Sequence, residues 1–291
     1  MSRVVLTLVV SAIASVGAAQ TPAPLLVDAA WLADHANDRN IVILHVDDEP
    51  EYRAGHIPNA RFVSMQQVSK APGPDSPLVL ELLPPDDLRA RLQNLGISDD
   101  SRIVVYGGTN GGFQSATRVI LTLDYAGLGG QTSLLNGGLS AWKRLNRRVT
   151  TDVPPVTPGT LSARPTKAVT VDAEYVKAIA QKPAHVLADG RAAAFYTGVT
   201  PTMGVAGHIP GAVSLPFTEI TNSELMVDRA RLEAMFKAAG VKPGDTVIAY
   251  CHIGQQGTTV VFAARLLGHP TMLYDGSMQD WTTNTRGPVV K

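Results

Sequence analysis

The stretch that decides the fold is Thr246-Val-Ile-Ala-Tyr-Cys-His-Ile-Gly-Gln-Gln-Gly-Thr-Thr-Val-Val-Phe-Ala-Ala-Arg-Leu-Leu-Gly268. Its apolar, β-branched start predicts a short buried strand from Thr246 to Tyr250. Its end predicts a helix from Thr258 to Leu267, capped at its start by Thr258 or Thr259 and stopped by Gly268. The loop between strand and helix, Cys251–Gly257, opens with the only cysteine of the chain.

The position of Cys251 gives it two interpretations. Glycines let a loop turn its N–H groups inward, and the start of the next helix adds a partial positive charge. Such a loop stabilises an anion, so it favours a thiolate or a persulfide on Cys251. The alternative is a small core hydrophobe, as most lone cysteines are. The glycine-containing turn that opens a helix favours the reactive thiol.

The composition indicates a globular chain of two domains. It has 291 residues, with 25 basic and 25 acidic side chains that cancel. No basic stripe is present, so we expect no nucleic-acid partner. One cysteine and seven scattered histidines offer no metal-ligand spacing, so we expect no metal and no other cofactor.

The N-terminus has the pattern of a secretory signal peptide at residues 1–19. Met1-Ser-Arg3 is a short basic start, Val4–Val16 is mostly apolar, and Gly17-Ala-Ala19 supplies small residues for cleavage near Ala19. The apolar run is short for a membrane span, and a buried N-terminal helix is the alternative. We expect export, to the periplasm, and no membrane contact after cleavage.

Two halves of the chain repeat each other in order. Gly55-His-Ile-Pro-Asn-Ala60 returns as Gly207-His-Ile-Pro-Gly-Ala212, and Leu135-Asn-Gly-Gly-Leu-Ser-Ala-Trp142 returns as Tyr274-Asp-Gly-Ser-Met-Gln-Asp-Trp281. The strand that ends at Tyr250 has a counterpart ending at Tyr106. These echoes predict a duplicated domain at residues 25–148 and 169–286, with an extended, proline-rich linker at residues 149–168.

Each half alternates strands with helices, which predicts an α/β fold with a parallel sheet covered by helices on both faces. The expected helices are residues 29–36, 86–94, 173–180 and 229–238, and the expected strands include residues 41–46 and 185–188. Residues 71–77 look like a loop insertion. Trp142 and Trp281 are expected core anchors.

Aligning the halves separates their roles. Gly107 stands where the second half has Cys251, so the first half has the loop without the nucleophile. We therefore expect a non-catalytic first domain that shapes one wall of a cleft, and a catalytic second domain.

These features resemble the rhodanese family of sulfurtransferases in its tandem, two-domain form. The matching motifs are the two Gly-His-Ile-Pro turns, Asp189-Gly-Arg191, the loop cysteine, and Asp275-Gly-Ser277 with Trp281; they cover about residues 25 to 285. The resemblance implies that Cys251 takes a sulfane sulfur from a donor such as thiosulfate, becomes a persulfide, and passes the sulfur to cyanide or a thiol. The implied persulfide-binding residues are His252, Ile253, Gly254, Gln255, Gln256, Gly257 and Arg191.

Departures from the family pattern leave the donor open. The thiosulfate-type loop carries cationic residues where this chain has His252 and Ile253. The mercaptopyruvate-type loop has a serine where this chain has Ile253. Phe195 occupies the position where the family has a second donor-binding arginine. Thiosulfate-like or persulfide donors are our first choice.

Several polar residues have both a functional and a structural interpretation. Arg191 either reaches the active-site wall or pairs with a carboxylate beneath the loop, and we favour the pairing. His56 and His208, in proline turns, are expected scaffold residues. Asp47 and His56 could also face the cleft from the first half. His252 is either a hydrogen-bond donor to the substrate or a solvent-facing side chain.

Two other functions compete with sulfur transfer. A cysteine phosphatase needs an arginine after five intervening residues to clamp phosphate, and Gly257 stands there instead. An exported sulfur carrier or binding module would keep a persulfide for a partner protein and turn over poorly with small acceptors.

Overall fold

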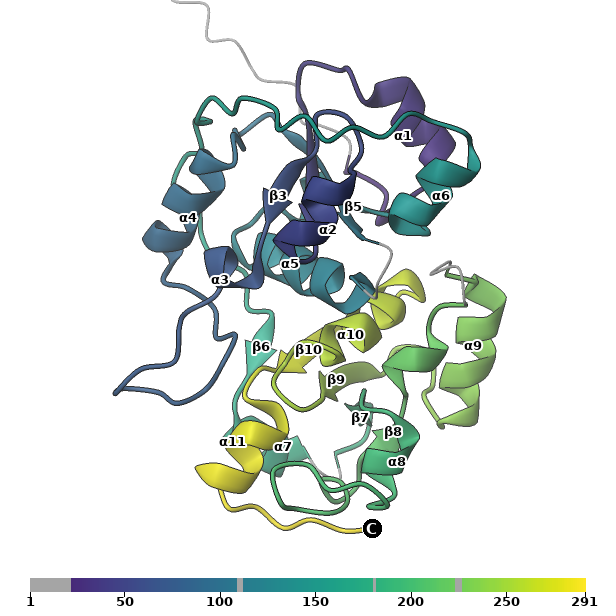
Figure 1. Ribbon diagram of the computed structural model, residues 1–291. Helices are drawn as coiled ribbons and strands as arrows, with labels where there is room; N and C mark the ends of the chain where they lie inside the picture. Colours follow the sequence, from purple (N-terminus) through teal and green to yellow (C-terminus); the bar gives the residue numbers. More distant parts are fainter. Residues whose placement is uncertain (1–21, 109–111, 180–181, 223–226) are drawn as a thin grey trace, which may run out of the picture.

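The structure is a computed structural model that describes residues 22–108, 112–179, 182–222 and 227–291. These residues form two lobes, the first coloured purple to teal and the second green to yellow (Figure 1). The predicted signal peptide, residues 1–19, lies outside the described residues. Within the described ranges, no helix combines the length and apolar character needed to cross a membrane.

The first lobe is built on a parallel sheet with strand order β1-β5-β4-β2-β3. Its strands are β1 (Leu26–Val27), β2 (Ile41–Val46), β3 (Arg61–Val63), β4 (Arg102–Gly107) and β5 (Thr132–Leu135). Its helices are α1 (Ala29–His35), α2 (Glu49–Ala54), α3 (Met65–Val68), α4 (Pro85–Asn94), α5 (Phe113–Tyr125), the 3-10 helix η1 (Gly129–Gln131) and α6 (Gly138–Arg144).

The second lobe repeats this arrangement with strand order β6-β10-β9-β7-β8, again parallel throughout. Its strands are β6 (Thr170–Val171), β7 (His185–Asp189), β8 (Val213–Ser214), β9 (Thr246–Tyr250) and β10 (Thr271–Tyr274). Its helices are α7 (Ala173–Ile179), α8 (Ala193–Tyr196), the 3-10 helix η2 (Phe217–Glu219), α9 (Arg229–Ala238), α10 (Gly257–Leu266) and α11 (Ser277–Thr283). The duplicated α/β fold is confirmed.

Both faces of each sheet are covered because the central strands are apolar on both sides. Successive side chains of a strand point to opposite faces. In β9, Val247 and Ala249 join the core under α9 and α10, whereas Ile248 and Tyr250 join the core under α7 and α11. Trp281 is 2% exposed in that second core, and Trp142 is 5% exposed in the first lobe. The prediction that both tryptophans are core anchors is confirmed.

The tyrosine that ends the central strand performs the same task in both lobes. The Tyr106 hydroxyl accepts the Ile57 N–H at 3.1 Å, and the Tyr250 hydroxyl accepts the Ile209 N–H at 3.1 Å. Each bond fixes a Gly-His-Ile-Pro turn to its sheet. The same long-range contact in both lobes is expected of a duplicated domain.

The histidines of these turns belong to the scaffold, as predicted. His56 is fully buried, stacks on Tyr52 at 3.8 Å, and bonds the Tyr52 carbonyl through Nδ1 at 2.8 Å. His208 stacks on Tyr196 at 3.8 Å and bonds its carbonyl at 2.9 Å. The possible role of His56 in the cleft has no support in this geometry.

The two lobes meet along α5 and α10, which lie side by side in the middle of Figure 1. The Phe113 ring meets the Phe262 ring edge-on, with centroids 6.4 Å apart. Beside them, the hydroxyls of Thr117 and Thr258 are 2.8 Å apart. The helix that follows the cysteine loop therefore packs directly on the first lobe.

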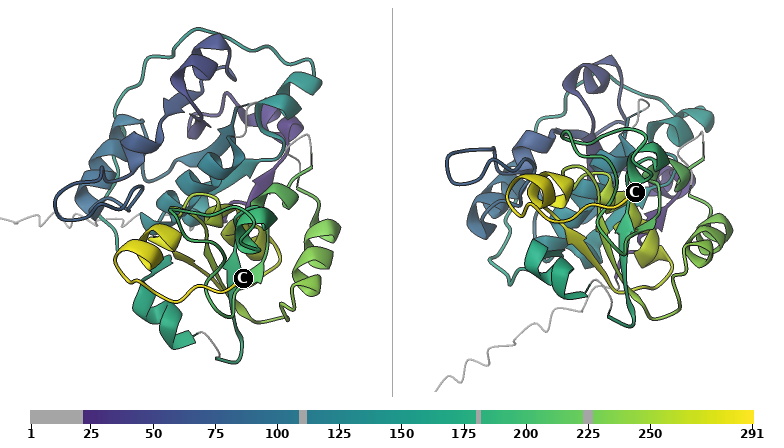
Figure 2. Two further views of the ribbon diagram at one scale, coloured as in Figure 1. Left: turned by 60° about the horizontal axis from the view of Figure 1, so that its bottom comes forward. Right: turned by 90° about the horizontal axis from the view of Figure 1, so that it is seen from below.

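The insertion at residues 71–77 also reaches the second lobe. Figure 2 shows this dark blue loop beside the yellow α11. Gln279 of α11 donates to the Pro77 carbonyl at 3.1 Å and accepts the Val79 N–H at 3.1 Å.

The segment between the lobes is extended but not free. Residues 151–169 form no helix or strand and run along the first lobe. The Gly159 N–H bonds the Gln93 carbonyl at 2.8 Å, and Arg164 pairs with Asp99 at 2.5 Å. The expected tether is fixed along much of its length.

Two details of the cysteine loop differ from the sequence prediction. The helix α10 begins at Gly257, so the loop ends at Gln256. No threonine caps it, because the Thr258 hydroxyl donates to the Gln255 carbonyl at 2.6 Å instead of accepting an N–H. The expected stop is correct, since Gly268 has φ +88°.

Candidate active site

Cys251 is the first residue after β9, the middle strand of its sheet. It therefore lies at the carboxyl edge of the sheet, where α/β folds place their ligands. Its side chain is 0% exposed, while His252, Ile253, Gln255 and Gln256 are half-buried around it. The thiol lies beneath the loop rather than on the surface.

Three carbonyls of the loop are held by outer partners, that is, by donors outside the loop. The Cys251 carbonyl accepts the Met278 N–H at 3.0 Å, and the His252 carbonyl accepts the Gln279 N–H at 3.0 Å. The Gly254 carbonyl accepts from Arg118 Nη1 at 3.0 Å. Helix α11 and the first lobe therefore fix the orientation of three successive parts of the loop.

This arrangement sets the direction of the N–H groups. In a planar trans peptide the C=O and the next N–H point opposite ways. The N–H groups of His252, Ile253 and Gln255 therefore point away from those outer partners. Among the described residues, none of these three N–H groups has an acceptor. Unpaired N–H groups in a loop of this shape form a cradle for an anion.

Ser277 fixes the backbone at Cys251 itself. Its Oγ accepts the Cys251 N–H at 3.0 Å and donates to the Tyr274 carbonyl at 2.9 Å. Ser277 is fully buried and has φ +51°, an unusual backbone conformation for serine that marks a constrained turn. The Asp275-Gly-Ser277 motif thus fixes the backbone at Cys251.

Gly254 is required by the path of the loop. Its φ is +80°, and a Cβ there would lie 2.5 Å from the Asp275 carbonyl oxygen and 2.8 Å from Asp275 Oδ1. Both the left-handed backbone and this close approach exclude a side chain.

Arg191 forms the favoured ion pair beneath the loop. The side chains of Arg191 and Asp189 are both 0% exposed, and Nη2 lies 2.6 Å from Asp189 Oδ2. Nε also bonds both carboxylate oxygens, while Nη2 reaches the Gly207 carbonyl. Arg191 is close enough to Cys251 to interact electrostatically. It lies behind the cysteine as a buried cation.

His252 is oriented by a short hydrogen-bonded chain. Arg191 Nη1 donates to Thr202 Oγ1 at 2.9 Å, and Thr202 Oγ1 lies 3.2 Å from His252 Nδ1. Among the described residues, the Thr202 hydroxyl proton has no other acceptor. Thr202 therefore donates to Nδ1, which places the ring proton on Nε2.

The His252 ring is also held neutral. Burial, and then the positive charge of Arg191, lowers the pKa of His252. Phe195 packs edge-on against the ring with centroids 4.6 Å apart. Phe195 thus helps to hold a neutral hydrogen-bond donor in place.

The other predicted loop residues have different surroundings. The Gln255 amide donates to Ser115 Oγ of the first lobe at 2.8 Å. Gln256 Oε1 is buried, with no hydrogen-bond partner among the described residues. Ile253 is half-buried, and Gly257 opens α10.

The described ends of the corresponding loop in the first lobe leave no room for a side chain. A Cβ on Gly107 would lie 2.5 Å from the Gly112 carbonyl carbon, so no cysteine fits there without a backbone shift. A Cβ on Gly112 would lie 2.9 Å from Asp47 Oδ2. Asp47 follows β2 as Arg191 follows β7, so a carboxylate stands where the second lobe has a cation.

Asp47 belongs to an acidic group in the first lobe. Among the described residues, Asp47, Asp48 and Glu51 are the one set close enough to hold a metal ion, with ligand atoms within 4.8 Å of one another. Burial, and then the neighbouring Glu51, raises the pKa of Asp47 to about 6. Asp47 and Ser115 line the same cavity of about 700 Å³.

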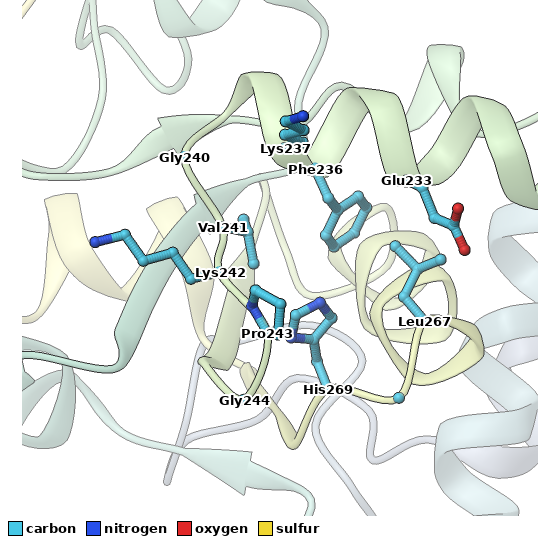
Figure 3. A pocket seen from close by; sticks show the side chains of 11 residues that line it. Glu233, Phe236, Lys237, Gly240, Val241, Lys242, Pro243, Gly244, Leu267 and His269 are labelled. Atoms are coloured by element: carbon cyan, nitrogen blue, oxygen red, sulfur yellow. The ribbon is translucent and has the colours of Figure 1, made fainter.

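A second cavity lies away from the cysteine. It measures about 790 Å³ and contains no residue of the Cys251 loop. Figure 3 shows Phe236, Leu267 and His269 around it, between α9 and the end of α10.

The sequence did not point to three contributors: Arg118, Ser115 and Thr202. It pointed to Ser277 only as part of a motif, without its hydrogen bond to Cys251. Arg118 had one signal, since it is a lone arginine in the otherwise apolar middle of α5. Ser115 and Thr202 are ordinary surface residue types that only the fold brings to the loop.

Comparison with known proteins agrees with this geometry. The rhodanese-like domain matches residues 28–145 and 172–284. A probable 3-mercaptopyruvate sulfurtransferase from Pseudomonas aeruginosa is 34% identical over 243 residues, covering 82% of this chain and 85% of that protein. The sulfur carrier protein TtuD from Thermus thermophilus is 28% identical over 285 residues, covering 92% and 96%.

A solved structure extends the match to three dimensions. SseA, a 3-mercaptopyruvate sulfotransferase from Escherichia coli, has a TM-score of 0.76 and 28% identity, covering 88% of this chain and 99% of that chain. The duplicated fold, the loop cysteine and these relatives lead to one conclusion: the chain belongs to the rhodanese family, in its tandem sulfurtransferase form.

Proposed function

We propose that this chain transfers a sulfane sulfur through a persulfide on Cys251. The observation that carries the proposal is the loop in which the carbonyls of Cys251, His252 and Gly254 are held by partners outside it, leaving the N–H groups of the residues that follow them, His252, Ile253 and Gln255, for an anion. Preorganised N–H donors stabilise charge most effectively in a site that excludes water. A persulfide is such an anion, and the burial of Cys251 protects it from solvent.

The reaction has two displacement steps. The Cys251 thiolate attacks the sulfane sulfur of the donor, forming an S–S bond while the donor's bond to that sulfur breaks. The electron pair leaves with the donor remnant, which is sulfite when the donor is thiosulfate. A nucleophile such as cyanide or a thiolate then attacks the outer sulfur, and the electron pair of the S–S bond returns to Cys251. The buried Arg191 cation is close enough to attract the negative charge of a persulfide on Cys251.

The donor is thiosulfate or a related compound, and His252 is the residue we assign to its anionic end. A neutral Nε2–H donor replaces the cationic side chains of the thiosulfate-type loop. This substitution weakens the discrimination in favour of a doubly charged donor, so 3-mercaptopyruvate is the second candidate. The similarity to 3-mercaptopyruvate sulfurtransferases from Pseudomonas aeruginosa and Escherichia coli supports this second donor.

The test is sulfur transfer to cyanide with each donor, measured for the wild type, Cys251→Ser and His252→Ala. We expect turnover by the wild type and none by Cys251→Ser. His252→Ala should raise KM for the better donor by about tenfold, the value of one hydrogen bond to a charged group. Full activity of Cys251→Ser would refute the mechanism.

A sulfur carrier is the second candidate function, and the similarity to TtuD favours it. A carrier would accept one sulfur at Cys251 but turn over poorly with cyanide. Comparing the amount of persulfide formed with the number of turnovers separates the two functions.

We also propose that the chain is exported, on the basis of the basic, apolar and small-residue pattern of residues 1–19. Expression of the full chain in a Gram-negative host, followed by fractionation and N-terminal sequencing, tests this. A periplasmic product that begins just after Ala19 supports export, and a cytoplasmic product that still begins at Met1 overturns it.

A further inference from the structure

The side chain of Arg118 links three segments that are far apart in sequence. It belongs to α5 of the first lobe and is 1% exposed. Nη1 donates to the Gly254 carbonyl at 3.0 Å and pairs with Asp275. Nη2 donates to the Leu80 carbonyl and lies 3.4 Å from Asp275 Oδ2. One guanidinium thus holds the cysteine loop, the turn after β10 and the Leu80 backbone of the first lobe.

The bond to Gly254 acts on the anion cradle directly. It is the only one of the three outer bonds described above that comes from the first lobe. Holding the Gly254 carbonyl outward turns the Gln255 N–H to the opposite side of the same peptide. The left-handed conformation of Gly254 permits this orientation but does not enforce it, because glycine populates several backbone regions readily.

The pairing with Asp275 makes the arrangement rigid. The planar guanidinium presents its donors in a fixed fork, so three acceptors can be held in one geometry. Asp275 precedes Gly276 and Ser277, and Ser277 accepts the Cys251 N–H. Arg118 therefore contacts both segments that shape the backbone around the cysteine.

We propose that Arg118 is a positioning residue for the persulfide cradle, supplied by the lobe that lacks the nucleophile. It acts through the Gly254–Gln255 peptide and touches neither the donor nor the acceptor. The proposal rests on the function proposed for Cys251 and gives the first lobe a part in the chemistry.

The test compares Arg118→Gln and Arg118→Lys with the matched control Arg89→Gln. Arg89 is an arginine of the first lobe on α4, paired with Asp86 at the surface. Three quantities are measured for each protein: the thermal midpoint, the single-turnover rate of persulfide formation with thiosulfate, and the pH profile of Cys251 alkylation by iodoacetamide.

We expect Arg118→Gln to slow persulfide formation about a hundredfold, as loss of an oxyanion-hole donor does. The midpoint of its alkylation profile should move to higher pH by about one unit, because the thiolate loses an oriented N–H. Arg118→Lys keeps the charge without the fork and should fall between Arg118→Gln and the wild type in both measurements. Arg89→Gln should match the wild type.

The outcomes separate a positioning role from a structural one. A lower thermal midpoint with an unchanged alkylation profile in Arg118→Gln would overturn the proposal. If Arg118→Gln does not fold, Arg118→Lys decides alone: a profile identical to the wild type refutes positioning. The alkylation profile needs no sulfur donor, so it tests Arg118 even if the wild type forms no persulfide, a result that would refute the proposed function instead.

Discussion

The buried pair Asp189–Arg191 offers the sharpest separation of stability from chemistry. Both side chains are 0% exposed, and the carboxylate accepts the Arg191 backbone N–H at 2.9 Å as well as three contacts from the guanidinium. In Asp189→Asn the guanidinium stays buried and charged without a counterion. Removing one partner of a buried pair costs about 3 kcal/mol of unfolding free energy. We expect that loss here.

The double variant Asp189→Leu/Arg191→Met removes both charges. Replacing a buried pair by apolar side chains is often neutral, but here Thr202, the Gly207 carbonyl and the backbone N–H at position 191 each lose a hydrogen bond worth about 1 kcal/mol. The double variant should therefore lose about 3 kcal/mol, about as much as the single variant. Its persulfide formation should nevertheless be slower than that of Asp189→Asn, because the cation behind Cys251 is gone.

Urea unfolding followed by tryptophan fluorescence measures the two free energies, and single-turnover persulfide formation measures the chemistry. A single variant within about 0.5 kcal/mol of the wild type would refute the reasoning, since changes of that size are typical of surface positions. A double variant as active as the wild type would show that Arg191 acts only on the fold.

Other predictions follow from the same contacts. Thr202→Val removes both the donor to His252 Nδ1 and the acceptor of Arg191 Nη1, so it should raise KM for the sulfur donor severalfold and lower the unfolding free energy by about 1 kcal/mol; an unchanged KM contradicts the role of Thr202. Gly107→Cys should lower the thermal midpoint and add no second persulfide, which intact mass measures. Gly254→Ala should abolish turnover in the cyanide assay while the circular-dichroism spectrum of the whole protein stays unchanged. Burial, and then Glu51, raises the pKa of Asp47 to about 6, so its ionised form destabilises the fold as pH rises from about 4 through 6. Asp47→Asn should therefore gain about 1 kcal/mol of unfolding free energy near pH 8, allowing for partial exposure, and almost none near pH 4; equal effects at both pH values contradict the assignment.

Much of the fold is predictable because it depends on local pattern. The apolar runs Ile41–Val46 and Thr246–Tyr250 mark buried strands, and the repeated Gly-His-Ile-Pro turns mark the duplication. The sequence predicts the start of α10 at Thr258 instead of Gly257 because threonine often caps helices, and only the structure shows the Thr258 hydroxyl donating to the Gln255 carbonyl. A hydroxyl can both donate and accept a hydrogen bond, and the sequence does not show which of the two it does.

The site was predictable where its residues are adjacent in the chain. Cys251, the cradle residues after it and the Asp189-Gly-Arg191 motif follow from spacing and resemblance. Arg118 and Ser115 come from the other lobe, and nothing local links position 118 to position 254. Their part depends on how α5 packs against α10, which is a property of the tertiary fold. Thr202 lies in a turn whose path the sequence does not fix.

The most direct measurement of the central claim is the intact mass of the protein after incubation with thiosulfate or 3-mercaptopyruvate, before and after cyanide, with Cys251→Ser as control. The account predicts a gain of one sulfur atom in the wild type, its removal by cyanide, and no gain in Cys251→Ser. A gain that persists in Cys251→Ser, or no gain with any sulfur donor, would contradict it.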